Sequence, residues 1–121
     1  MTRTNIIITL QIEGFHRWKD APREVDFLKE RHRHIFHFVV EKAVQHNDRD
    51  IEIILFKRRI FKYLQDRYTY LDENTQTKTI EFGNKSCETL ANEIIEEFEC
   101  NRVKVTEDNE NGAVVYKSKE V

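Results

Sequence analysis

The feature that most constrains the fold is the stretch at residues 33–45, where apolar side chains recur at every second position. Side chains two residues apart point to the same face of a strand. The stretch therefore predicts a long strand, and residues 5–17, which are β-branched and partly alternating, predict a second one. The strand at residues 33–45 would have two faces. One would carry His34, Phe36, Phe38, Val40 and Lys42, and the other Ile35, His37, Val39, Glu41 and Ala43.

Two helices are predicted farther along the chain. Residues 51–66 start extended and then place apolar side chains at three-to-four spacing, which is typical of an amphipathic helix. Ser86 is a good N-terminal cap for a second helix at residues 87–98. Residues 19–30 are mostly polar and contain the only proline, so they predict a loop.

The remaining segments predict short strands. Residues 68–83 favour a hairpin, and residues 102–107 and 113–117 favour a final pair of strands joined by a turn. Together with the long strands and the helices, these segments predict a single α+β domain over residues 1–121. We expect a four-stranded antiparallel sheet with two helices on one face. Its exposed edges would favour assembly of several copies.

Composition and charge exclude some classes of function. The chain has 20 basic and 22 acidic residues and a net charge of −2, which gives no general case for binding nucleic acid or membranes. The apolar run at residues 6–8 is too short for a secretory or transmembrane segment. The two cysteines, Cys87 and Cys100, then predict reduced thiols and a cytoplasmic location.

Three histidines indicate a metal site. His32 and His34 would present two imidazoles from one face of a strand, and His16, near the end of the other long strand, would supply a third. Three imidazole nitrogens with one open position are typical of catalytic zinc sites. The alternative is that these are ordinary strand histidines, because the pattern His-x-His also arises by chance.

Four stretches, taken in order, resemble the 6-pyruvoyl- and 6-carboxy-tetrahydropterin synthases, the pterin-forming branch of the T-fold (tunnelling-fold) proteins. No single stretch is strongly diagnostic, but together they span most of the chain from residue 6 to residue 116. The stretches are Phe15-His16-Arg17-Trp18, His32-Arg33-His34-Ile35-Phe36, Lys85-Ser86-Cys87-Glu88-Thr89-Leu90-Ala91, and Val103-Lys104-Val105-Thr106-Glu107-Asp108 with Tyr116 after the turn.

The resemblance implies a T-fold whose subunits close into a β-barrel, typically as a trimer stacked in pairs to give a hexamer. It also implies that His16, His32 and His34 bind Zn²⁺. Glu107 would match the glutamate that anchors the pterin ring, and Glu88 the family's glutamate at the start of the second helix. The alternatives are an exposed acid at the end of a strand for Glu107, and an acid that complements the helix dipole for Glu88.

The chain departs from the family pattern at both groups that move protons. The family has a cysteine shortly before its His-x-His pair, and no cysteine lies there in this chain. The family's Asp-His pair after the first helix is matched here by Asp66 followed by Arg67, and arginine is a poor proton acceptor. The candidates left for this role are Cys87, Asp66 and Glu30. A helix N-terminus would lower the pKa of Cys87, although a buried packing cysteine is the alternative.

Three functions therefore remain open from the sequence. The first is a zinc-dependent lyase acting on a pterin or purine-like small molecule, with or without a phosphate group. The second is a catalytically silent T-fold protein that binds or sequesters a nucleotide- or pterin-like molecule. The third is a structural α+β domain whose histidines bind nothing.

Overall fold

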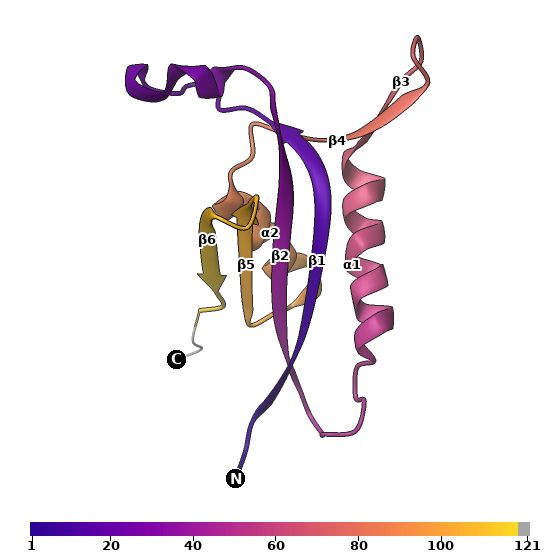
Figure 1. Ribbon diagram of the computed structural model, residues 1–121. Coiled ribbons are helices and arrows are strands. Elements are labelled where there is room, and N and C mark those ends of the chain that lie inside the picture. The colour runs from indigo at the N-terminus through magenta and orange to yellow at the C-terminus, as the bar shows by residue number, and fades with distance from the viewer. Residues whose placement is uncertain (119–121) are drawn as a thin grey trace.

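Two long antiparallel strands form the centre of the computed structural model, which describes residues 1–118. Strand β1 (Thr4–His16) pairs with β2 (His32–Val44) along its whole length, from Thr4 opposite Val44 to His16 opposite His32. The alternation seen in the sequence decides which face is buried. Inward-facing side chains of both strands are shielded by the helices, and the strands run side by side through the molecule in Figure 1.

The sheet has six strands in the order β3-β4-β1-β2-β5-β6, so the predicted four-stranded antiparallel sheet is wrong. Strands β5 (Arg102–Glu107) and β6 (Asn111–Tyr116) extend it beyond β2, as expected. The sheet is not purely antiparallel because of the hairpin of β3 (Thr69–Asp72) and β4 (Thr77–Gly83). Strand β4 of this hairpin pairs with the end of β1 in parallel orientation. The sheet is therefore mixed and open.

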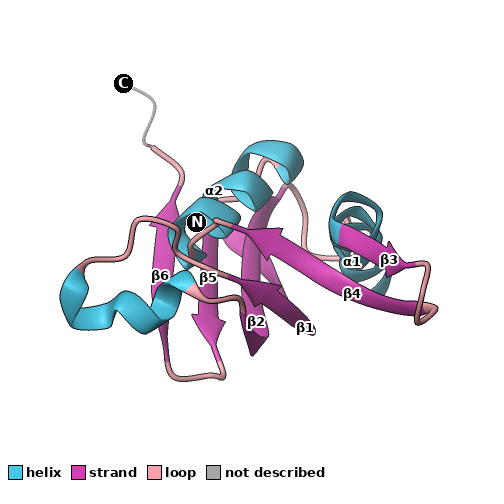
Figure 2. Cartoon of the chain, turned by 90° about the horizontal axis from the view of Figure 1, so that it is seen from above, coloured by secondary structure: helices cyan, strands magenta, loops and turns pink. Residues whose placement is uncertain are grey.

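Helices α1 (Ile53–Tyr68) and α2 (Cys87–Phe98) cover the same face of this sheet, as Figure 2 shows. Their apolar side chains share one core with the inward faces of β1, β2 and β5. The Ser86 hydroxyl accepts a hydrogen bond from the Thr89 N–H, which explains why α2 begins where the sequence predicts. The fully buried core includes Phe36, Phe38, Val40, Phe56, Ile60, Leu64, Leu90, Ile94, Val103 and Val105.

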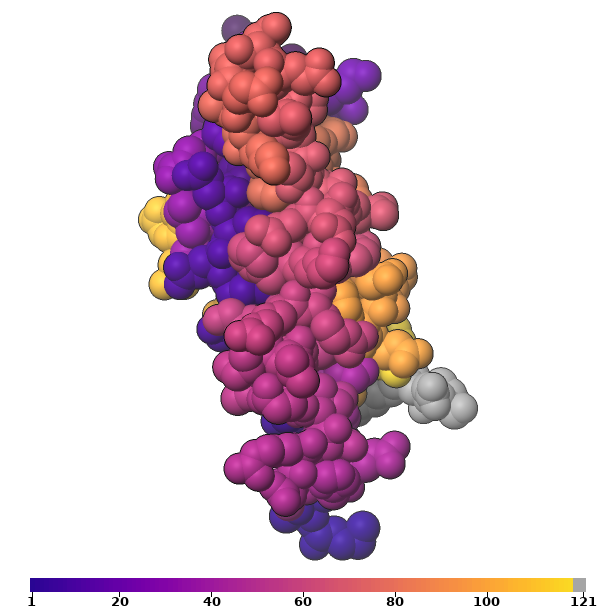
Figure 3. All heavy atoms as spheres, turned by 90° about the vertical axis from the view of Figure 1, so that its right-hand side faces the viewer, coloured from indigo at the N-terminus to yellow at the C-terminus, as the bar shows by residue number. Residues whose placement is uncertain are grey.

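The segment predicted as a loop at residues 19–30 contains a 3-10 helix, η1 (Arg23–Lys29). None of its residues is buried, so the segment packs no apolar face against the core. On the other side of the molecule, α1 runs along the surface and the β3–β4 hairpin extends beyond its end (Figure 3). Within residues 1–118, no helix is both long and apolar enough to cross a membrane.

A largely buried carboxylate links the two helices. Glu93 on α2 accepts hydrogen bonds from the hydroxyls of Tyr63 and Tyr68 on α1 and from the Lys85 ammonium group before α2. Arg67 forms an ion pair with the same carboxylate at 3.0 Å. The Glu93 side chain is only 13% exposed, so these partners replace the water that it loses on folding.

We expect Glu93→Gln to lower the free energy of unfolding by about 1–3 kcal/mol, because an amide cannot accept all of these hydrogen bonds. Burial alone would raise the pKa of Glu93, but the hydrogen bonds from Lys85, Tyr68 and Tyr63 lower it below 4.5. The stabilisation is therefore complete above about pH 4.5 and lost as the pH falls through the lowered pKa. Urea unfolding between pH 3 and 7 measures both effects. Glu97→Gln, at an exposed site on the same helix, is the control, and equal losses in the two variants would contradict the prediction.

Candidate metal centre

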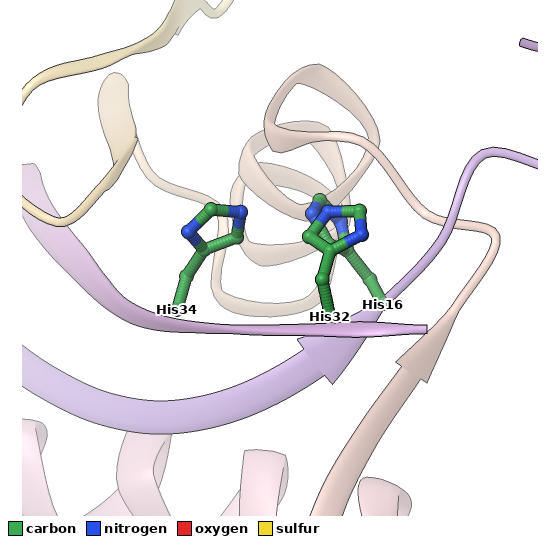
Figure 4. A group of neighbouring side chains, drawn as sticks. All are labelled: His16, His32 and His34. Carbon is green, nitrogen blue, oxygen red and sulfur yellow. The ribbon is translucent and has the colours of Figure 1, made fainter. Parts of the chain in front are cut away.

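Three imidazoles converge where β1 ends and β2 begins. His16 lies directly opposite His32 in the strand pairing, and His34 follows on the same face of β2. The ring centroids are 4.6 Å apart for His16 and His32, 5.3 Å for His16 and His34, and 5.0 Å for His32 and His34. Figure 4 shows the three rings on the same side of the strands. Nitrogen atoms of the three rings lie within 4.8 Å of one another, so the cluster could hold a metal ion.

Each ring has an acceptor at its Nδ1 atom. His16 Nδ1 lies 2.9 Å from the carbonyl oxygen of Lys85, and His32 Nδ1 lies 2.8 Å from that of Glu30. Carbonyl oxygens only accept hydrogen bonds, so both rings carry a proton on Nδ1. His34 Nδ1 lies 2.7 Å from the Asp108 carboxylate, which favours the same tautomer. In the neutral form, all three rings therefore keep the Nε2 lone pair for a metal, the arrangement in which outer partners orient metal-binding histidines.

The Nε2 atom of His16 supports the fit to a metal ion. It is buried and has no hydrogen-bond partner among residues 1–118. Buried polar atoms in native proteins nearly always have a partner, so this orphaned nitrogen calls for an explanation. A cation shared with His32 and His34 would satisfy it, and neutral imidazole suits zinc and several other transition metals.

Glu107 contributes a negative charge to this cluster. It lies on the same sheet face, opposite Phe36 in the pairing of β2 with β5, and its carboxylate oxygens lie 3.1 Å from His16 Nε2 and 3.5 Å from His34 Nε2. The contact with His16 lowers the pKa of Glu107 despite burial. Conversely, burial would lower the pKa of His16, but Glu107 and the Lys85 carbonyl raise it above 6.5. The site thus combines three imidazoles with an ionised carboxylate.

A cleft of about 550 Å³ opens beside the cluster, which is within the range of small-molecule sites. His16, His32 and Glu107 line it, together with side chains from the chain segment after β1, from η1 and from the start of α2. Cys87 and Glu88, both predicted as site residues, belong to its wall. Trp18 also lines the cleft and is 46% exposed, so its ring is accessible to a flat ligand.

The structure favours a buried packing cysteine over a reactive thiol at Cys87. Its thiol is buried, and burial, reinforced by the Glu107 and Glu88 carboxylates, raises its pKa to about 12. These effects outweigh the influence of the helix N-terminus that the sequence indicated. At neutral pH the Cys87 side chain is therefore a thiol and not a thiolate.

The other two candidate proton carriers are not in the cleft of a single chain. Asp66 lies on the exposed side of α1, where its carboxylate pairs with Lys62 at 2.6 Å. Glu30 contributes to the site only through its backbone carbonyl, which accepts the hydrogen bond from His32. His37 lies three residues after His34 and so on the opposite face of the sheet, as its position in the strand predicts.

Sequence reasoning missed the residues that orient the histidines. The Asp108 carboxylate accepts hydrogen bonds from both His34 Nδ1 and the Ile35 N–H. Both bonds lower the pKa of Asp108, and the bond from Ile35 has the larger effect. The Asp108 side chain therefore stays ionised. Lys85 supports His16 through its carbonyl group while its side chain joins Glu93. The only sequence signal for Asp108 is its place directly after Glu107, where the strand gives way to a turn.

We expect Asp108→Asn to weaken metal binding by about 10- to 100-fold, the usual effect of losing an outer partner of a metal-binding histidine. The amide oxygen of the substituted side chain can still accept from Ile35, and asparagine tolerates the left-handed backbone found at this position, with φ of 56°. Only the bond to His34 is then lost. Competition with a chromogenic chelator measures the affinity, and urea unfolding without metal serves as the control for structure. Unchanged affinity would show that Asp108 does not support the site.

Comparisons with known proteins add no evidence for or against this site. No protein-family model matches the chain, and a search of curated proteins finds no match either. The case for a metal centre therefore rests on the geometry of the histidines and their partners.

Proposed function

We propose that this protein is a divergent T-fold protein of the tetrahydropterin synthase type, which binds Zn²⁺ through His16, His32 and His34. In this proposal it acts on a pterin or purine-like small molecule, with or without a phosphate group, by lyase-type chemistry. One observation carries the proposal: three imidazoles with occupied Nδ1 atoms converge beside a cleft of ligand size. Zinc is chosen because neutral imidazoles with an open position are typical of catalytic zinc sites.

The ring of the ligand would lie near Glu107. An ionised carboxylate can accept two parallel hydrogen bonds from the amino group and the adjacent ring N–H of an aminopyrimidine. The lowered pKa of Glu107 keeps that carboxylate ionised at neutral pH. Trp18 offers a flat surface for stacking, and Glu88 is a second acceptor on the same wall.

A bound zinc ion would polarise an oxygen of the ligand and acidify the adjacent C–H bonds. The residues of the chain would orient the ligand and hold the imidazoles in the required tautomer. The Cys87 thiol can donate a proton but is a poor acceptor at neutral pH, because its pKa is raised to about 12. A base for the lyase reaction would have to come from another copy of the chain or from the ligand itself.

The lack of an evident base favours a second candidate function. A T-fold protein with the metal and the ring anchor but without a proton acceptor would bind or sequester a nucleotide- or pterin-like molecule without turnover. The raised pKa of Cys87 and the surface position of Asp66 are the specific observations that support this alternative. Both cysteines are free thiols, which supports a cytoplasmic location for either function.

Assembly into a β-barrel is part of the proposal. In the described chain, β1 meets β4 only through Phe15 and His16, which leaves the rest of that side of β1 without a strand partner, and β6 has a neighbour only on its β5 side. Unpaired edges of this kind favour pairing with another chain, and a ring of subunits would remove them. We therefore propose a trimer or hexamer. Size-exclusion chromatography with light scattering tests it, and a single species of 14.6 kDa would contradict it.

Incubation of the zinc-loaded protein with dihydroneopterin triphosphate distinguishes the two functions. Release of triphosphate, lost when His16 is replaced by alanine, supports the lyase. Retention of an intact pterin in native mass spectra without any turnover supports the binding protein. A protein that takes up no zinc and retains no ring-containing molecule would contradict both.

A further inference from the structure

The carboxylate of Glu107 lies in direct contact with two of the imidazoles. A residue that only binds an organic ligand does not require such short distances to the histidines. One oxygen of Glu107 lies 3.1 Å from His16 Nε2, and the other lies 3.5 Å from His34 Nε2. These are the same Nε2 atoms that remain free once Nδ1 of each ring is bound. The carboxylate therefore lies on the metal side of the imidazoles.

The short contact between Glu107 and His16 needs a positive charge, which either a proton on Nε2 or a metal ion supplies. In the neutral ring, His16 carries its proton on Nδ1, so its Nε2 and the carboxylate oxygen are both acceptors. The two atoms do not form a hydrogen bond, although they are 3.1 Å apart and the nitrogen is buried. Two acceptors at this distance repel each other unless a positive charge lies between them.

Two distances are close to those of ligands that share one metal ion, whereas Glu107 lies outside the group of ligand atoms that are all within 4.8 Å of one another. In a tetrahedral site with metal–ligand bonds of about 2.0–2.2 Å, neighbouring ligand atoms lie about 3.3–3.5 Å apart. The separation of 3.1 Å between one Glu107 oxygen and His16 Nε2 is close to that spacing, and the other oxygen lies 3.5 Å from His34 Nε2. A hydrogen-bonded pair would not require the carboxylate to face both rings at once.

We propose that Glu107 is the fourth metal ligand when no organic ligand is bound, so that a pterin-like ring can use this carboxylate only by drawing it away from the metal. This inference rests on the proposed function, and it adds that the organic ligand controls how many protein ligands the metal has. The resting metal is closed by four protein ligands, and arrival of the ring opens one position. Because binding effects between two sites are reciprocal, metal and ring must weaken each other's binding by the same factor.

Cobalt(II) tests the first part of this proposal, because its visible absorption is strong in tetrahedral sites and weak at higher coordination number. We expect Glu107→Gln to weaken Co²⁺ binding at least tenfold and to reduce the absorption, since a neutral amide is a poorer ligand. Glu110→Gln removes the same charge from the exposed turn three residues away and should change neither. Circular dichroism and thermal unfolding of the metal-free variants control for folding.

The outcomes separate this inference from the proposed function. If the unaltered protein binds no Co²⁺ and no Zn²⁺, the metal centre itself is wrong and the inference fails with it. If the protein binds Co²⁺ and Glu107→Gln binds it equally well or more tightly, Glu107 only pairs with a protonated His16. In that case the inference is overturned while the three-histidine centre stands.

A second measurement needs no variant. Unsubstituted pterin has the aminopyrimidine edge but no side chain that could reach the metal. We expect it to bind the Co²⁺-loaded protein at least fivefold more weakly than the metal-free protein, and to weaken Co²⁺ binding by the same factor. Independent or cooperative binding would overturn the displacement. If pterin does not bind at all, the proposed ring site is wrong, and the comparison of Glu107→Gln with Glu110→Gln still decides whether Glu107 is a ligand.

Discussion

Replacing His32 by alanine is expected to lower the affinity for Zn²⁺ by about 100- to 1000-fold. Structural zinc sites bind with about 10–16 kcal/mol, or about 2.5–4 kcal/mol for each of four ligands, and 1.4 kcal/mol corresponds to a factor of ten. The His32 ring is only partly buried and its one hydrogen bond is to a neighbouring carbonyl. Its loss should therefore leave the metal-free fold nearly unchanged, so the effect on zinc is specific.

His37→Ala is the matched control for this experiment. It removes an imidazole from the same strand, but from the face opposite the cluster. Chelator competition gives the two affinities, and elemental analysis of protein purified without chelators gives the metal content. Equal zinc binding by the two variants would mean that the imidazoles of His16, His32 and His34 do not form a metal centre.

The long strands could be predicted because each has a solvent-exposed face and a buried face, and the sequence alternates between polar and apolar residues accordingly. Phe36, Phe38 and Val40 are fully buried, at the positions that the two-residue period assigns to one face. The second helix was equally predictable, since Ser86 stops it from starting earlier and its side chain is the cap. In these segments the local signal and the packed structure agree.

The place of the β3–β4 hairpin could not be predicted in the same way. It joins the sheet through only two residue pairs, Phe15 with Glu81 and His16 with Gly83, and the register shifts between them. So short a contact leaves no periodic pattern in the sequence. The first helix shows a related limit: Ile53 fits the three-to-four spacing of the apolar side chains of α1 but is 47% exposed, because it lies in the first turn, where Ile54 and Leu55 are exposed as well.

Part of the histidine cluster could be predicted from the sequence. The spacing of His32 and His34 and the strand that carries them predict that two rings share a face, and the pairing with β1 places His16 beside them. The partners that set the tautomers were invisible, because Lys85 lies 69 residues from His16 and Asp108 lies 74 residues from His34. Contacts at such separations depend on the packed fold and not on any local pattern.

Phe36→Ala is expected to lower both the stability and the affinity for zinc, whereas Phe38→Ala should lower only the stability. Both rings are 0% exposed and lie two residues apart on one face of β2, so each truncation should lower the free energy of unfolding by about 3–5 kcal/mol. Only Phe36 packs edge-to-face against the imidazoles, at 5.1 Å from His16 and 5.7 Å from His34. Without its ring, both imidazoles gain freedom that zinc binding must remove.

We expect this freedom to reduce zinc affinity about tenfold in Phe36→Ala, a loss comparable to that of an outer hydrogen-bond partner. Urea unfolding of the metal-free proteins and chelator competition of the folded proteins separate the two effects. Phe36→Leu and Phe38→Leu provide a milder pair that keeps the comparison if the alanine variants do not fold. Equal zinc affinity in the two members of a pair would show that the packing below the rings does not orient them, and that the hydrogen bonds at Nδ1 alone hold the imidazoles in place.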